Sequence, residues 1–378
     1  MKYYTRFVGL DVHKDSILPA VAVLGRGDAE VFGRIPNEDQ VIVRWLNRRL
    51  RAWGTLEDVL FCYEAGPCGY GLYRFLAGLN LDCQVVAPGL VPRRPLDRVK
   101  TDRRDARQLA RLLRAGELTP IWVPDEAHEA FRTLVRGREA TLEDRTRSRH
   151  QLSKFLLCRG LRPPAGVKSW TRRFQEWVDS LRLNQQADEF VLLELRHHVR
   201  EGTDRLSRFD GYIKECVETS VWRPAIEALQ CLRGVRLLTA ATIVAELGEI
   251  ARFTHPRQLM SYAGLVPGEH SSGKRVRRLS ITKAGNAHLR RILGEAAWHY
   301  RHRPHVSICL ARRQRGQPRE VVAISWRAQT RLNYRYRYLL GHRKEKNRVI
   351  TALARELVGF IWEILQVVPS PTAELSAA

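Results

Sequence analysis

Residues 6–113 alternate between short apolar runs and amphipathic segments, and this alternation constrains the fold more than any other feature of the chain. The apolar runs that predict strands lie at residues 6–13, 16–24, 30–35, 58–64 and 82–87. The segments that predict helices lie at residues 36–50, 70–79 and 102–113. Strands and helices in this order are typical of an α/β sheet with helices on both faces. Pro124 ends the pattern, so we expect a first domain at residues 1–124.

Four acidic residues occupy the strands and the last helix of this domain. Asp11 lies in the first strand and Glu64 ends the fourth. Asp102 and Asp105 are three residues apart at the start of the helix, which places them on one face, and Thr101 is the predicted N-cap. These four acids are therefore the candidate site of the domain.

A carboxylate in a sheet requires a partner, because an unpaired buried charge is costly. Mg²⁺ is bound by oxygen ligands, and two such ions activate the nucleophile and stabilise the leaving oxygen of a phosphodiester. The four acids together could hold two Mg²⁺ ions. The alternative is four unrelated acids, with Asp102 and Asp105 ion-paired to neighbouring arginines.

The chain of 378 residues has a formal net charge of +24, which predicts a polyanionic partner. No apolar run is as long as a membrane span, so nucleic acid is the expected partner rather than a membrane. No signal peptide is evident, and the seven scattered cysteines fit neither a zinc site nor a disulfide framework. We expect a cytoplasmic protein with reduced thiols.

Residues 125–225 carry two long helical patterns, at 125–158 and 185–219, separated by Pro163-Pro164. They predict either a coiled-coil hairpin or a plain helical bundle. The apolar stripe of the second helix consists of Phe190, Leu193, Leu195, Val199, Leu206 and Ile213.

Residues 226–378 are predicted to form a mainly helical third domain. Residues 229–248 resemble a helix-hairpin-helix, whose glycine turn presents backbone N–H groups to a phosphate, although Arg236 replaces the usual second glycine. Plain helix packing is the alternative. Residues 288–348 hold 16 Lys or Arg against three acids, with interleaved aromatic residues. Such a composition suits phosphate contact and base stacking, although about half of the aromatics are expected in the core.

The ordered segments FVGLDVHKD, YEAG and KTDRRDARQLARLL resemble the DEDD-type transposases of bacterial insertion sequences, the IS110 family, whose relatives include pilin-gene invertases. The segments LMSYAGLVP, EHSSGKR and ITKAGN resemble its C-terminal transposase domain. The resemblance implies a RuvC-like fold of the ribonuclease H type for the first domain, with Asp11, Glu64, Asp102 and Asp105 as catalytic metal ligands. It also implies that Ser261, in a Ser-x-x-Gly-x-x-Pro pattern, is a nucleophile, with Ser271 or Ser272 as the alternative.

The resemblance further implies a recombinase that cuts and rejoins double-stranded DNA of its own element through a phosphoserine link. It implies a structured noncoding guide RNA and a dimer that assembles into a tetramer. A metal-dependent junction resolvase or nuclease without the covalent step, and a non-catalytic nucleic-acid-binding protein, are the rival interpretations. The predicted nucleic-acid contacts are Arg103, Arg104, Lys274, Arg275, Arg277, Arg278, Lys283, Asn286, Arg290 and Arg291.

Overall fold

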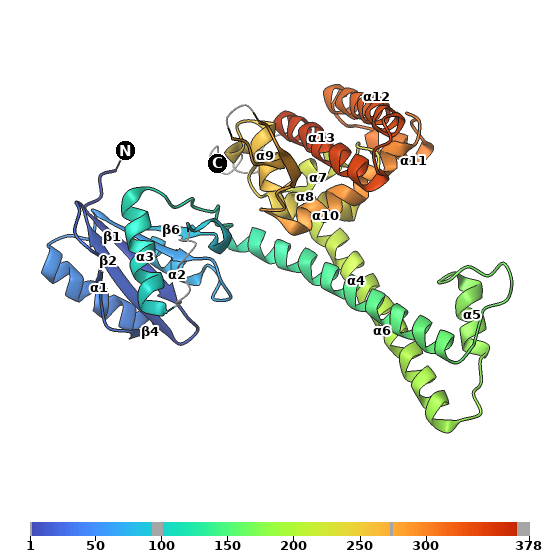
Figure 1. Cartoon of the computed structure of the whole chain (residues 1–378), viewed down its shortest axis with the longest axis horizontal. Helices are drawn as coiled ribbons and strands as arrows, with labels where there is room; N and C mark the ends of the chain where they lie inside the picture. Colours follow the sequence, from blue (N-terminus) through green and yellow to red (C-terminus); the bar gives the residue numbers. More distant parts are fainter. Residues whose placement is uncertain (1, 93–100, 273–274, 369–378) are drawn as a thin grey trace. The chain divides into compact units, whose positions relative to one another are not determined.

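The computed structural model describes residues 2–92, 101–272 and 275–368. The chain forms two compact units, Met1–Pro124 and Asp125–Ala378, and each is considered by itself (Figure 1). The predicted residue Lys274 lies outside the described residues.

The first unit is built on a mixed sheet. Its strands are β1 (Arg6–Val12), β2 (Ser16–Val23), β3 (Glu30–Val31), β4 (Ile35–Pro36), β5 (Val59–Glu64) and β6 (Asp82–Val86). The strand order is β3-β2-β1-β5-β6, and β4 also pairs with β2. β1 is antiparallel to β2 and parallel to β5, and β5 is parallel to β6. The single strand expected at residues 30–35 is wrong, because two short strands, β3 and β4, replace it.

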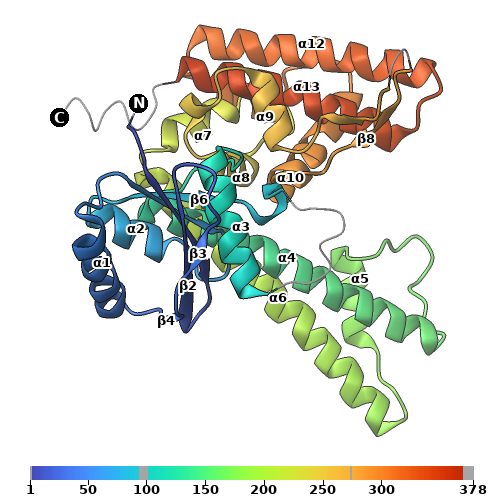
Figure 2. The same cartoon turned by 60° about the vertical axis from the view of Figure 1, so that its left-hand side comes forward.

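Helices cover both faces of this sheet, as predicted. They are α1 (Asp39–Trp53), α2 (Gly71–Gly78) and α3 (Asp102–Ala115), with a 3₁₀ turn, η1 (Pro88–Leu90). Figure 2 shows α3 on one face of the sheet and α1 and α2 on the other. The alternation of side chains along a strand supplies both cores. In β1, Phe7 belongs to the core under α3, whereas Val8 and Leu10 belong to the core under α1 and α2.

Two long helices begin the second unit. They are α4 (Glu126–Cys158) and α6 (Gln186–Thr219), which lie side by side, with α5 (Arg172–Ser180) near the end of the pair (Figure 1). Leu192, Val199, Leu206 and Ile213 are buried at intervals of seven residues, the spacing of a coiled-coil seam. The predicted stripe is therefore right at its last three positions. It is wrong at Phe190 and Leu193, whose exposed fractions are 64% and 47%.

The rest of the second unit is mainly helical around one apolar core. Its elements are α7 (Arg223–Leu229), α8 (Leu237–Leu247), η2 (Ile250–Arg252), α9 (Pro256–Tyr262), β7 (Pro267–Glu269), β8 (Arg278–Ile281), α10 (Ala287–Ala297), η3 (Trp298–Arg301), α11 (Ile308–Gln314), α12 (Arg319–Gly341) and α13 (Lys346–Val367). None of the helices in the described parts of the chain is long and apolar enough to cross a membrane. The separation of residues 125–225 and 226–378 into two domains stays a prediction.

Candidate active site

The parallel pairing of β1 and β5 brings two of the predicted acids to one edge of the sheet. Leu10 is paired with Tyr63, so Asp11 and Glu64 follow at the carboxyl ends of neighbouring strands. Both residues are partly buried. Because Glu64 is the last residue of β5 and β1 continues past Asp11 only by Val12, the two acids lie where the sheet core ends.

Helix α3 supplies the other two acids. Asp102 and Asp105 lie in its first turn, and Ala106, Leu109 and Ala110 on its buried face pack against the sheet. Thr101 is the N-cap residue, as predicted, but its side chain makes no capping hydrogen bond. The helix therefore begins with two carboxylates, which interact favourably with the positive end of its dipole.

Gly9 allows α3 to approach β1 closely. A Cβ atom added at Gly9 would lie 2.5 Å from the backbone nitrogen of Ala110 and 2.6 Å from the carbonyl oxygen of Ala106. Any side chain at this position would therefore displace the helix backbone. The glycine two residues before Asp11 thus sets the distance between the two pairs of acids.

The close-packed helix leaves Asp11 near Asp102, with a histidine between them. His13 Nε2 lies 3.3 Å from Asp11 Oδ2 and 3.5 Å from Asp102 Oδ2. Arg34 donates a hydrogen bond to Asp102 Oδ2 and another, of 3.2 Å, to the Ser16 hydroxyl.

These surroundings shift the two carboxyl groups in opposite directions. Burial raises the pKa of Asp11, and the negative charges of Asp102 and Asp105 raise it further, against the lowering effect of His13. The hydrogen bond from Arg34 lowers the pKa of Asp102. An additional nearby cation would therefore stabilise the charged form of Asp11, whose pKa is raised, more than that of Asp102, which already has Arg34.

The cluster fits a divalent cation. One ligand atom from each of Asp11, His13 and Asp102 lies within 4.8 Å of the others. Asp11 Oδ2 is buried, and beyond its 3.3 Å contact with His13 Nε2 it has no hydrogen-bond partner within the described residues. A carboxylate oxygen in that state is a suitable ligand for a hard cation such as Mg²⁺. Asp11, His13 and Asp102 thus form a group that could hold a divalent metal ion, and Glu64 lies at the same sheet edge.

His13 and Arg34 were not predicted as members of the site. His13 follows Asp11 by two residues, the interval that places side chains on one face of a strand, so alternation along β1 was a usable signal. Arg34 offered no comparable signal, because its contact with Asp102 joins residues 68 positions apart.

In the second unit, Ser261 is exposed near the end of α9. Its hydroxyl makes no hydrogen bond to any residue that the structure describes. The turn after it is tightly defined: Gly264 has a φ of +65°, and its amide donates to the Ser261 carbonyl over 2.8 Å. A Cβ atom at Gly264 would lie 2.6 Å from Arg290 Nη1, which donates to the Ala263 carbonyl.

Tyr262, the next residue, is held at two points. Its hydroxyl donates to the Glu246 carbonyl over 3.0 Å, and its own carbonyl accepts from the Asn286 amide over 2.8 Å. Gly285 makes the second contact possible, because a Cβ atom there would lie 2.2 Å from the Tyr262 carbonyl oxygen. The backbone that carries Ser261 is therefore fixed from both sides.

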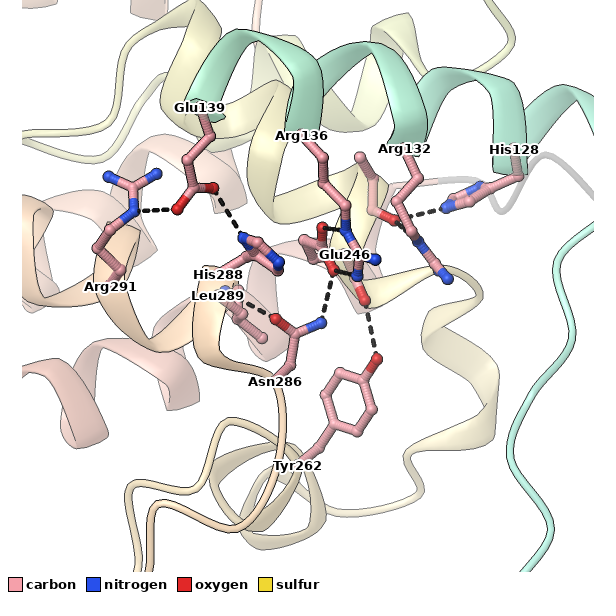
Figure 3. A network of polar contacts seen from close by, with 11 residues as sticks. His128, Arg132, Arg136, Glu139, Glu246, Tyr262, Asn286, His288, Leu289 and Arg291 are labelled. Atoms are coloured by element: carbon pink, nitrogen blue, oxygen red, sulfur yellow. Dashed lines mark hydrogen bonds and ion pairs between the residues drawn. The ribbon is translucent and has the colours of Figure 1, made fainter. Parts of the chain in front are cut away.

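The fully buried carboxylate of Glu246 joins these elements (Figure 3). Arg136 of α4 donates to both its oxygens over 2.7 and 2.8 Å, and the Asn286 side chain donates over 2.6 Å. Burial would raise the pKa of Glu246, but Arg136 and Asn286 outweigh it and lower that pKa. This Glu246 network links α4, α8 and α10, and Tyr262 adds α9.

A second buried acid, Glu139, lies on α4 one turn after Arg136 (Figure 3). Glu139 accepts from Arg291 over 2.5 Å and contacts His288 over 2.9 Å. Burial acts to raise the pKa of Glu139, and the two basic partners lower it below its ordinary value. Arg291 also pairs with Glu295.

The predicted nucleic-acid contacts differ in what surrounds them. The exposed ones are Arg103, Arg104, Arg275, Arg277 and Lys283. Arg278 opens β8. Asn286, Arg290 and Arg291 have the internal partners described above, so each has a structural role beside its predicted one. Among the alternative nucleophiles, the Ser271 hydroxyl donates to Glu269 over 2.7 Å, unlike that of Ser261.

Comparison with known proteins identifies relatives across most of the chain. Residues 226–307 match a family described as "Transposase IS116/IS110/IS902 family", and residues 8–158 match a DEDD transposase family of the IS110 type. The chain is 45% identical over 363 residues to the putative transposase y4qE of Sinorhizobium fredii, covering 96% of this chain and 89% of the relative.

Two further relatives extend this likeness. The transposase for insertion sequence element IS1533 of Leptospira borgpetersenii is 32% identical over 90% of this chain and 98% of its own length. The pilin gene-inverting protein of Moraxella bovis is 27% identical over 52% of each chain. With the acid cluster at the sheet edge and these matches in both units, the chain belongs to the IS110/IS116/IS902 family of insertion-sequence transposases.

Proposed function

We propose that this transposase cuts and rejoins the DNA ends of its own insertion sequence with an acid-bound metal and a serine nucleophile. The observation that carries the proposal is the approach of Asp11, His13 and Asp102 around a buried Asp11 oxygen that, within the described residues, has no hydrogen-bond partner beyond its contact with His13, in a chain of this family. The exposed, unbonded hydroxyl of Ser261 in the second unit is the supporting observation.

Asp11, Glu64, Asp102 and Asp105 would hold Mg²⁺, as one ion or as a pair. When bound, the metal supplies positive charge that polarises the phosphodiester and stabilises the developing negative charge on its oxygens. His13 Nε2 lies 3.3 Å from Asp11 Oδ2, so a cation on that oxygen shares it with the imidazole or displaces the ring. Arg34 keeps Asp102 ionised and oriented.

Ser261 would supply the attacking oxygen. Its Oγ forms a bond to phosphorus while the bond from phosphorus to one deoxyribose oxygen of the DNA strand breaks, and that oxygen takes up a proton as the serine loses one. The phosphoserine link preserves the energy of the phosphodiester, so a free DNA hydroxyl rejoins the strand by the reverse displacement without ATP. The fixed turn at Gly264 and Tyr262 holds the backbone of the nucleophile in one place.

A structured noncoding RNA of the element would guide the reaction, and a tetramer of two dimers would bring the DNA duplexes together. The net charge of +24 and the exposed arginines Arg103, Arg104, Arg275 and Arg277 support a nucleic-acid partner. Both the RNA and the tetramer rest on the resemblance of the sequence to the family.

The test mixes purified protein with labelled element-end and target DNA, Mg²⁺ and RNA transcribed from the noncoding flank of the element, and separates the products on a denaturing gel. We expect a protein-linked DNA band that is lost in Ser261→Ala and retained in Ser271→Ala. Asp11→Asn should lose both the linked band and cleavage. Omission of the RNA tests the guide separately.

The rival functions, a nuclease or resolvase and a non-catalytic binding protein, predict different bands on the denaturing gel. Cleavage to free ends that persists in Ser261→Ala would replace the recombinase with a metal-dependent nuclease or resolvase. DNA binding with neither cleavage nor a linked band in the wild-type protein would leave a non-catalytic binding protein. A linked band that survives in Ser261→Ala but not in Ser271→Ala would move the nucleophile to Ser271.

A further inference from the structure

An open cleft of about 830 Å³ lies beside the turn that joins α7 to α8 in the second unit. The turn and the start of α8 form one wall, the end of α10 with η3 forms another, and α11 completes it. The cleft is separate from Ser261 and Glu246, neither of which lines it.

Four basic side chains line this cleft: Arg233, Arg236, His299 and Arg313. Its one acidic lining residue, Glu295, is already paired with Arg291 over 2.6 Å.

The arginines of the cleft contact only neutral acceptors. Arg233 donates to the Arg303 carbonyl over 2.7 Å, and Arg313 donates to the Val235 carbonyl. Arg236 is exposed, and its side chain has neither a hydrogen bond nor an ion pair to the described residues. Within the described part of the chain, the charge of the cleft is therefore not neutralised.

Three arginines elsewhere in the same unit form ion pairs with carboxylates instead. Arg136 pairs with Glu246, Arg138 with Asp210 and Arg291 with Glu139. The difference matters because clustered like charges repel one another. Burial and the positive charge of Arg236 lower the pKa of Arg313. Burial and, to a smaller extent, the positive charge of Arg233 lower the pKa of His299. An anion in the cleft would relieve this repulsion.

The backbone adds positive potential on the same side. Arg236 is the N-cap of α8, its side chain makes no capping hydrogen bond, and the first amides of an α-helix carry partial positive charge. Gly234, with a φ of +80°, fits the turn against α10: a Cβ atom there would lie 2.6 Å from the Ala296 carbonyl oxygen and 2.9 Å from His299 Cδ2. The position of the turn beside His299 is thus fixed.

We propose that this cleft, which we call the turn cleft, binds a phosphodiester of a nucleic-acid backbone. The open shape and the exposed Arg301, Arg303 and Arg315 around it suit a continuous strand better than a small free anion. The inference rests on the proposed function only in taking nucleic acid as the source of the phosphate.

Cys309 gives a direct readout, because it is a free, exposed thiol that lines the cleft. The full-length protein is pulse-alkylated with iodoacetamide alone, with a short duplex DNA, with a single-stranded RNA of equal length, or with inorganic phosphate. Mass spectrometry then compares Cys309 with the exposed Cys158, which ends α4. We expect the DNA or the RNA to slow alkylation of Cys309 several-fold relative to Cys158, and the arm that does so identifies the source of the phosphate.

Arg236→Gln removes one cation without removing an internal contact, and Arg319→Gln is the matched control on an exposed arginine outside the cleft. The binding constant for duplex DNA falls as the salt concentration rises, and Arg236→Gln should make the slope of log K against log salt concentration less negative by about 0.9, the value for one phosphate contact. The same variant should abolish protection of Cys309. Arg319→Gln should leave that protection unchanged.

Three results would overturn the assignment of the turn cleft as a phosphodiester site. The first is unchanged alkylation of Cys309 at saturating DNA and at saturating RNA. The second is protection by inorganic phosphate alone, and the third is full protection in Arg236→Gln. Failure of the recombinase proposal is distinguishable, because the serine-linked DNA band and the Cys309 readout come from separate reactions: either can be absent while the other is present.

Discussion

Gly9 is the residue on which the geometry of the acid cluster depends most directly. It permits the backbone of α3 to lie against β1, and the first turn of that helix carries Asp102 and Asp105. The requirement is steric rather than conformational, since the nearest atoms to an added Cβ belong to the backbone of Ala106 and Ala110. Flexible side chains can yield to a new methyl group, whereas a helix backbone must move as a whole.

Gly9→Ala should therefore destabilise the first unit and separate its acids. Overpacking of a well-packed core costs about 1–3 kcal/mol, occasionally more. The measurement is the free energy of unfolding from hydrogen exchange of β1 and β5, with and without Mg²⁺. Gly33→Ala is the matched control, because an added Cβ there meets no atom within 4 Å. Equal stability of the two variants, with equal stabilisation by Mg²⁺, would refute the steric role of Gly9.

Glu246 makes the stability of the second unit depend on pH. Its pKa is lowered in the folded protein, so the folded state binds a proton less readily than the unfolded state does. The resulting stabilisation is complete above the unfolded pKa of about 4.3 and is lost as the pH falls through the lower folded pKa.

Glu246→Gln should lower the free energy of unfolding at neutral pH by about 1.5–3 kcal/mol, because the buried carboxylate and its charge-assisted hydrogen bond with the half-exposed Arg136 are lost. Between pH 5 and 3, roughly, the variant should lose less stability than the wild type, since it has no carboxyl group to protonate there. Chemical denaturation across this range is the measurement. Glu227→Gln, which removes an exposed ion pair with Arg223, should change the stability by about 0.5 kcal/mol or less. Parallel pH curves for wild type and Glu246→Gln would contradict the assignment.

At the scale of elements, the far end of the α4–α6 pair has a small core of its own. Leu192 of α6 is fully buried there with Leu152, Phe174 and Val178, so α5 covers the ends of the two long helices. Leu192→Ala should cost about 2–5 kcal/mol locally and expose the amides of α5. Hydrogen exchange followed by mass spectrometry of residues 172–180 measures the loss directly.

Phe190→Ala is the comparison for this prediction. Phe190 lies two residues away on the same helix but is 64% exposed, so its removal should leave the exchange of α5 unchanged. Similar exchange in the two variants would show that α5 is not held by the core around Leu192.

The long helices were predictable within about one residue, because their apolar periodicity persists over many turns. Helix α5 was not predicted: it has nine residues, and the Pro163-Pro164 signal before it indicated only a break. The strand expected at residues 30–35 failed for another reason. β3 and β4 pair with different parts of β2, and Arg34, between them, reaches Asp102 instead of continuing the strand.

At the scale of the whole molecule, the sequence indicated which residues carry chemistry better than it indicated their partners. The positions of the four acids in the strands and at the start of a helix could be predicted, because local patterns predict those elements, whereas their catalytic role stays a prediction. The pairs Arg136–Glu246 and Arg34–Asp102 could not, since they join residues 110 and 68 positions apart. The sequence also could not predict whether a given polar side chain faces solvent. Asn286 lies in a basic segment, yet its side chain donates a hydrogen bond to the buried Glu246.

The continuity of α4 has a mechanical consequence. The same unbroken helix carries Arg136, which forms an ion pair with Glu246, and extends to Cys158 at its far end. At 1.5 Å per residue, the stretch from Arg136 to Cys158 is a rod of about 33 Å. A tilt of about 5° about the Glu246 contact moves the far end of such a rod by about 3 Å. The Glu246 contact adjoins the turn that carries Ser261, through the Tyr262 hydroxyl on the Glu246 carbonyl, so we expect a displacement of the far end of α4 to act on that turn.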